Sequence, residues 1–173
     1  MEAKTRQVYY STMGRKRFFA GLILLLLILT ASVAVAVYAL TVRYSPPEHE
    51  KNAGNGIPVV KEDYLYRTMK SDFGYSFSMA ANLYQRKDGS VSVFLTNPVE
   101  NDVNILCEIR DMETGLLYYK SGLLFPGEFV ENLKPDTKFS NELHNVTVKV
   151  LAYEPESFLS AGTTELKLTL QPW

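Results

Sequence analysis

An uncharged apolar segment near the N-terminus constrains this chain more than any other feature. From Phe18 to Leu40, 23 consecutive residues carry no charge, and their sequence is FFAGLILLLLILTASVAVAVYAL. As an α-helix this segment would be about 34 Å long, enough to cross the roughly 30 Å hydrocarbon core of a bilayer. A buried helix of a soluble protein rarely stays apolar on every face over such a length. The sequence therefore predicts a single transmembrane helix over residues 18–40.

Basic residues beside this segment set its expected direction. Arg15, Lys16 and Arg17 precede it, whereas only Arg43 follows it before an acidic stretch. Lysine and arginine are retained on the cytoplasmic side of a membrane, so we expect residues 1–17 to form a cytoplasmic basic tail and the rest to lie outside the cell, in a type II orientation. A cleaved secretory signal is the alternative. Its hydrophobic region is usually shorter, which favours an uncleaved signal anchor.

The residues after the helix differ sharply in composition. Residues 41–61 contain prolines and glycines without any periodicity, so we expect a juxtamembrane spacer. An aromatic-rich segment follows, and it could bind a partner or pack on the domain as an N-terminal strand. Aromatic side chains combine a large apolar area with, in tyrosine, a polar tip, which makes four of them candidate partner-binding residues: Tyr64, Tyr66, Phe73 and Tyr75.

Beyond Ser76 the apolar residues alternate with polar ones, and turn residues separate the runs. This pattern predicts about seven half-buried antiparallel strands. We expect residues 62–173 to form an all-β domain, as an immunoglobulin-like sandwich or, alternatively, a small β-barrel. The Cys…Trp…Cys core of true immunoglobulin domains is absent, since Trp173 is the only tryptophan. The expected strands cover residues 77–83, 91–96, 105–110, 117–121, 129–133, 146–152 and 166–170.

Two side chains on these strands bear on function. Cys107 falls on the apolar face of an expected core strand, where a free thiol is normally an inert small hydrophobe. Alternation in the run 117–121 directs Tyr119 to the core and Tyr118 to solvent. Tyr118 is therefore a fifth candidate partner-binding aromatic.

The stretch from Asn97 to Gly127 contains a series of turn and strand residues: Asn97-Pro98, Asn101, Glu108–Asp111, Thr114-Gly115, Tyr119–Leu124 and Pro126-Gly127. This series resembles small β-sandwich ectodomains of uncharacterised membrane-anchored or secreted proteins of Gram-positive bacteria. The resemblance implies a β domain displayed by such a bacterium. It implies no catalytic residue, and it carries no function over to this chain.

The sequence offers no constellation for catalysis. His49 falls in the expected spacer and His144 near the start of a strand, and neither accompanies a nucleophile motif. No spacing typical of metal ligands is present, so we expect no catalytic residue, no metal site and no cofactor. Paired carboxylates lie in expected turns, where solvated charge is the ordinary interpretation and hydrolysis or calcium binding the weaker one: Asp111 with Glu113, and Glu154 with Glu156.

The net charge of the expected extracellular part limits the classes of partner that it could bind. Residues 45–173 contain 12 lysines and arginines against 18 aspartates and glutamates, a balance of −6, so we expect no nucleic acid. The sequence favours a non-enzymatic, single-pass protein that is held in the lipid bilayer and displays its β domain outside the cell. There it would bind other cell-surface or membrane proteins, or serve in a surface or secretion assembly. The alternative is a module that binds carbohydrate or cell-wall polymer.

Overall fold

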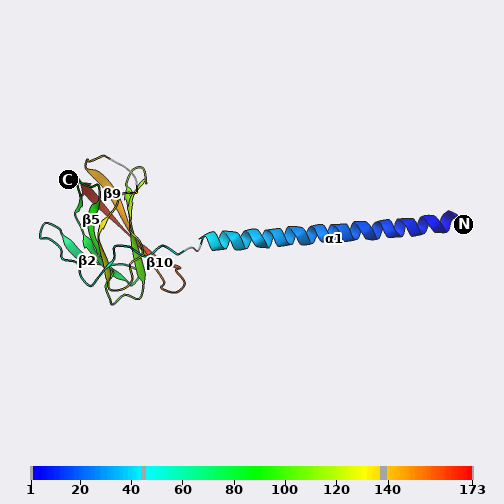
Figure 1. Cartoon of the computed structure of the whole chain (residues 1–173), viewed down its shortest axis with the longest axis horizontal. Coiled ribbons are helices and arrows are strands. Elements are labelled where there is room, and N and C mark those ends of the chain that lie inside the picture. The colour runs from blue at the N-terminus through cyan, green and yellow to red at the C-terminus, as the bar shows by residue number, and fades with distance from the viewer. Residues whose placement is uncertain (1, 44–45, 137–139, 173) are drawn as a thin grey trace. The chain divides into compact units, whose positions relative to one another are not determined.

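The computed structural model describes residues 2–43, 46–136 and 140–172. The chain divides into two compact units, Met1–Ser45 and Pro46–Trp173. Figure 1 shows the first unit as one helix and the second as a β domain.

The first unit is the helix α1, Glu2–Arg43. It contains a 22-residue apolar segment, Phe18–Ala39, none of which is buried. This confirms the expected apolar helix, whose length and composition are those of a membrane span. A signal sequence at the N-terminus has the same features, and neither property sets a direction across the membrane. The helix begins before the apolar segment, because residues 2–17, the expected basic tail, are helical as well.

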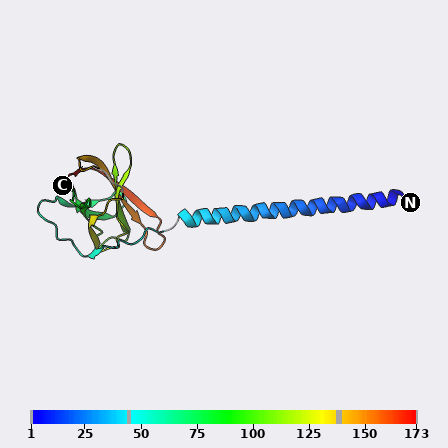
Figure 2. The same ribbon diagram turned by 45° about the horizontal axis from the view of Figure 1, so that its top comes forward.

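Hydrogen bonds connect all ten strands of the described residues into one sheet, which curls into a half-barrel (Figures 1 and 2). Along the sheet the order is β1-β8-β5-β4-β10-β9-β6-β7, while β2 pairs with β3 and β3 also pairs with β5. The strands are β1 (Gly54–Asn55), β2 (Tyr66–Lys70), β3 (Ser76–Ala80), β4 (Leu83–Gln85), β5 (Val91–Thr96), β6 (Asn104–Asp111), β7 (Leu117–Lys120), β8 (Glu128–Leu133), β9 (His144–Tyr153) and β10 (Ser160–Gln171).

The all-β prediction is confirmed, but the immunoglobulin-like sandwich is not. A sandwich needs two separate sheets. Here the parallel pairing of Leu83 in β4 with Leu170 in β10 joins the two halves of the sheet. Alternation along a strand shows which side chains face inward and says nothing about which strands pair. The expected run 77–83 is also divided, since a bend at residues 81–82 separates β3 from β4.

The interior of the curled sheet is filled by aliphatic and aromatic side chains from most of the strands. Cys107 is among them and is fully buried, as the sequence predicted. Burial raises the pKa of its thiol to about 12, so the protonated, unreactive form prevails at ordinary pH.

Strand β5 departs from the expected alternation, because all six of its residues are buried. Its outer face is covered by the aromatic segment. The Tyr64 ring lies 4.8 Å from the Phe94 ring in an edge-to-face contact, and the Tyr66 hydroxyl lies 2.7 Å from Thr96 Oγ1. These contacts support the alternative in which the aromatic segment packs on the domain.

Candidate functional site

Tyr75 does not belong to an exposed binding face. Its side chain is only 3% exposed. The hydroxyl donates a hydrogen bond to the Val150 carbonyl at 3.0 Å and lies 2.9 Å from Thr164 Oγ1. Tyr75 therefore ties the turn between β2 and β3 to β9 and β10, which is a structural role.

The expectation that Tyr118 points into solvent is wrong. The side chain is 5% exposed, and its hydroxyl donates to Asp111 Oδ2 at 3.0 Å. Desolvation, reinforced by this carboxylate, raises the pKa of Tyr118 to about 12. Alternation failed here because Tyr118 also packs edge-to-face against His144, with 5.4 Å between ring centroids, so both faces of β7 are covered.

Asp111, one of the paired carboxylates, serves the same turn. Its Oδ1 accepts hydrogen bonds from the backbone amides of Thr114 and Glu113 and from the Thr114 hydroxyl. The Thr114 bonds are the largest cause that lowers the pKa of Asp111 to about 2. A carboxylate held in this way closes a turn.

The other three candidate aromatics lie against different elements. Tyr64 and Tyr66 are half-buried over β5, whereas Phe73 is 60% exposed. The Phe73 ring lies directly over Gly162 of β10, where a Cβ atom would collide with it. The five aromatics therefore form no single cluster, and only Phe73 presents most of its surface to solvent.

Tyr66 belongs to a groove on the outer face of the sheet, with a volume of about 370 Å³. We call it the outer groove. Its floor carries hydroxyl groups that bond in pairs, Tyr66 with Thr96 at 2.7 Å and Thr68 with Ser78 at 2.8 Å. The groove is lined by Gly56, Ile57, Tyr66, Thr68, Ser76, Ser78, Thr96, Asn97, Pro98, Val99, Glu100 and Gly127.

The walls of the outer groove are apolar and exposed. Ile57 on one wall is 80% exposed, and Val99 on another part of the lining is 71% exposed. Glu100 is the one charged residue among those that line it. A concave surface with apolar walls and a few polar groups is typical of binding sites. This groove has little signature in the sequence, because its lining comes from segments far apart in the chain.

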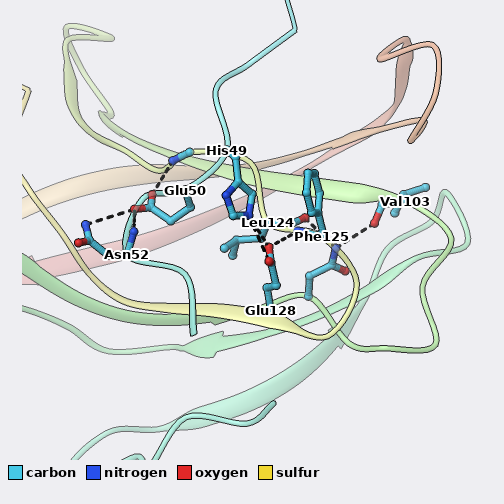
Figure 3. A network of polar contacts seen from close by, with 9 residues as sticks. His49, Glu50, Asn52, Val103, Leu124, Phe125 and Glu128 are labelled. Carbon is cyan, nitrogen blue, oxygen red and sulfur yellow. Dashed lines mark hydrogen bonds and ion pairs between the residues drawn. The ribbon is translucent and has the colours of Figure 1, made fainter. Parts of the chain in front are cut away.

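The segment Glu48–Asn55, which we call the strap, lies on the β domain, where the sequence predicts a spacer. His49 forms a parallel bridge with Leu123, and β1 pairs with β8. In Figure 3 the His49 ring faces Glu128, and its Nε2 donates to Oε2 at 2.9 Å and Oε1 at 3.1 Å. The same ring stacks on Phe125, with 4.6 Å between centroids. Most of the expected spacer therefore belongs to the compact unit.

A buried carboxylate holds the centre of the strap. Glu50 is 9% exposed, and its Oε2 accepts the Gly122 amide at 2.6 Å. Its Oε1 accepts the Asn52 amide at 3.0 Å, as Figure 3 shows. The backbone of Glu50 also donates to the Leu123 carbonyl at 2.9 Å. Both oxygens of this buried carboxylate, and the Glu50 amide, are therefore paired.

Asn97, from the Asn-Pro pair that begins the series Asn97–Gly127, is fully buried and bonds to three other residues. Its Nδ2 donates to the Val103 carbonyl at 2.9 Å and the Leu124 carbonyl at 3.0 Å. Its Oδ1 accepts from Asn101 Nδ2 at 2.6 Å. The sequence predicts only a strand end at Asn97. The structure shows that the asparagines of this series organise a junction of loops.

Both histidines contact polar groups of the described residues, and the Ser140 hydroxyl lies 3.3 Å from His144 Nε2. His49 pairs with Glu128, and His144 Nε2 donates to the Ser140 carbonyl at 3.0 Å. Over the described ranges, no three side chains of His, Cys, Asp or Glu converge as metal ligands would.

No family model, no curated protein and no solved structure matches this chain.

Proposed function

We propose that this protein is a non-enzymatic, single-pass membrane protein of type II orientation, which displays its β domain outside the cell to bind other proteins. The binding would take place at the cell surface or within a surface or secretion assembly. One observation carries the proposal: an apolar helix long enough to cross a bilayer precedes a compact β unit in the same chain.

The β unit supports a binding role through its surface. Exposed apolar side chains gather at the outer groove, and exposed apolar patches on soluble domains usually mark interaction sites. The described titratable groups with large pKa shifts serve the core or a turn, as Cys107 and Asp111 do. These environments support a role for the two groups in holding the fold together.

Cross-linking in intact cells tests the proposal. The full chain carries an affinity tag and is recovered from solubilised membranes after cross-linking. A control chain keeps residues 1–45 and replaces the β unit with an unrelated domain. We expect a stoichiometric protein partner with the full chain and not with the control. Repeated recovery of the chain alone would contradict the proposal.

Two further measurements test orientation and anchoring. Lys51 is highly exposed, so the Lys51→Cys variant should react with a membrane-impermeant maleimide on intact cells. A Thr5→Cys variant should react only after lysis, which is the matched control. Intact mass should equal that of the complete chain, 19.6 kDa. Reversed labelling overturns the orientation, and a shorter mass overturns the uncleaved anchor.

A second candidate function, carbohydrate or cell-wall binding, is favoured by a polar groove beside β8. Planar polar side chains, which suit sugar hydroxyls, line it together with Phe129. Arg86 Nη1 donates to Asn132 Oδ1 at 3.2 Å across it. Cosedimentation of the full chain, held in detergent, with purified wall polymer tests this function. The matched control is the double variant Arg86→Ala, Asn132→Ala. If the polymer retains the wild type no more strongly than this variant, carbohydrate binding at this groove is excluded.

A further inference from the structure

We infer that the outer groove binds an extended peptide segment of a partner protein, with small apolar side chains and at least one basic residue. This inference rests on the proposed protein-binding function and gives it a location. Three properties of the groove and its border support it: unpaired backbone beside the groove, exposed apolar side chains, and a single negative charge over a neutral floor.

The first property is the backbone beside the groove. Gly56 donates its amide to the Gly127 carbonyl at 2.8 Å. In the four residues after it, the backbones of Ile57, Val59 and Val60 make no hydrogen bond to any described residue, while Pro58, which has no amide hydrogen, is buried. Unpaired backbone amides and carbonyls pair readily with the backbone of an added peptide. A glycan or a lipid chain would not offer this alternating series of donors and acceptors.

The second property is the apolar surface at the groove. Ile57 and Val99 line it and are 80% and 71% exposed, and Val59, two residues after Ile57, is 87% exposed. An extended peptide directs alternate side chains to the same side, about 7 Å apart. Small apolar side chains at that spacing would cover these exposed surfaces. Their removal from water would favour binding.

The third property is the charge of the lining. The floor hydroxyls of Tyr66, Thr68 and Ser78 are neutral, and Glu100 is the charged residue of the lining. Glu100 makes no ion pair with a described residue. Since residues 45–173 carry a balance of −6, a basic side chain near Glu100 is complementary, and an acidic one would be repelled.

Selection from a peptide library tests the inference with a defined probe. The full chain, held in lipid nanodiscs, is panned against phage-displayed random dodecapeptides, and affinities of selected peptides are measured by fluorescence polarisation. We expect basic peptides with alternating small apolar residues. Val99→Glu should weaken them at least about tenfold, equivalent to about 1.4 kcal/mol. Leu143→Glu is the matched control, because Leu143 is 64% exposed and lies outside the groove.

A charge-reversal variant and hydrogen exchange test where the selected peptides bind. Glu100→Lys should weaken the basic peptides and leave thermal unfolding unchanged. Bound peptide should slow exchange of the Ile57 and Val59 amides. A library that yields no peptide, peptides that bind Val99→Glu as tightly as wild type, or enrichment of acidic peptides would each overturn the inference.

The outcomes also separate this inference from the proposed function. If cross-linking in cells recovers the same partner from wild type and from Val99→Glu, the protein-binding function stands and the groove is the wrong surface. If the full chain recovers no partner, the proposed function fails irrespective of the groove. Retention of soluble wall glycans at the groove, weakened by Val99→Glu, would replace the peptide with a carbohydrate.

Discussion

The Glu50 carboxylate accepts a hydrogen bond from the Gly122 amide at 2.6 Å, although the two residues are 72 positions apart. The two backbones approach so closely that a Cβ on Gly122 would lie 2.5 Å from both the Cα and the nitrogen of Glu50. Glycine at position 122 and the buried carboxylate at position 50 therefore form one junction, which fixes the strap on the β domain.

Gly122→Ala should loosen this junction. The added methyl group meets backbone atoms that cannot rotate away, and overpacking of this kind costs about 1–3 kcal/mol. We expect a lower free energy of unfolding in urea and faster hydrogen exchange at the Gly122 amide and the Glu50 amide. Lys51→Ala is the control, because the Lys51 ion pair with Glu48 is almost fully exposed. Equal exchange in wild type and Gly122→Ala would contradict the close approach.

Asn97→Ala should lower the stability of the domain, because the Asn97 side chain donates hydrogen bonds to buried backbone carbonyls. The substitution removes the Nδ2 group that donates to the Val103 and Leu124 carbonyls. The Leu124 carbonyl still accepts the Ile105 amide at 3.0 Å. The Val103 carbonyl loses its donor, and a buried polar group left unpaired costs about 1–3 kcal/mol. Thermal unfolding of the purified chain measures the loss. Val99→Ala, at an exposed neighbour in the same loop, should change the midpoint little. An unaltered midpoint in Asn97→Ala would show that the buried Asn97 side chain is dispensable.

The lowered pKa of Asp111 predicts that the folded domain loses stability in acid. Its pKa lies at about 2 in the folded chain, below the ordinary value of 3.8, chiefly because of the Thr114 hydrogen bonds. A depressed pKa stabilises the fold above 3.8, and that contribution is lost as the pH falls through about 2. Asp111→Asn should flatten the fall in thermal midpoint over this range. Asp72→Asn, at an exposed residue of the β2–β3 turn, should retain the wild-type slope. If Asp111→Asn also retains it, the turn does not depend on the charge.

Cys107 should be unreactive until the domain unfolds. The thiol is fully buried, and its pKa is raised to about 12. Iodoacetamide should leave the folded chain unmodified for hours and should alkylate it promptly in concentrated urea, as measured by intact mass. The exposed thiol of Lys51→Cys gives the rate for an accessible site. Rapid alkylation of the wild-type chain without urea would place Cys107 outside the core.

Local patterns predicted the elements of this protein and missed how they combine. The long segment without charged residues identified the apolar helix. The alternation of apolar and polar residues located most of β3 to β10. The parallel contact of Leu83 with Leu170 has no local signature, so a curled sheet could not be distinguished from a sandwich. Alternation also fails where both faces of a strand are covered, as at Phe94 and Tyr118, because each outer cover comes from a distant segment.

The candidate site was predictable only in part, for the same reason. Tyr66 was singled out from composition and lies in the outer groove, whereas Ile57 and Val99 belong to stretches interpreted as a spacer and a strand end. Glycine and proline in residues 41–61 suggested a chain without structure. Here Gly54 instead allows close packing, since the Phe129 ring occupies the space where its Cβ would lie.

The strap has a mechanical consequence. A pull on the chain at its N-terminal side would reach the β domain first at the Glu48 to Leu123 backbone bonds, then at Glu50 and Gly122, and only later at β1. These bonds would take the load before any strand of the core. Under a pulling force, the strap would therefore detach from the β domain first, while the half-barrel stays folded.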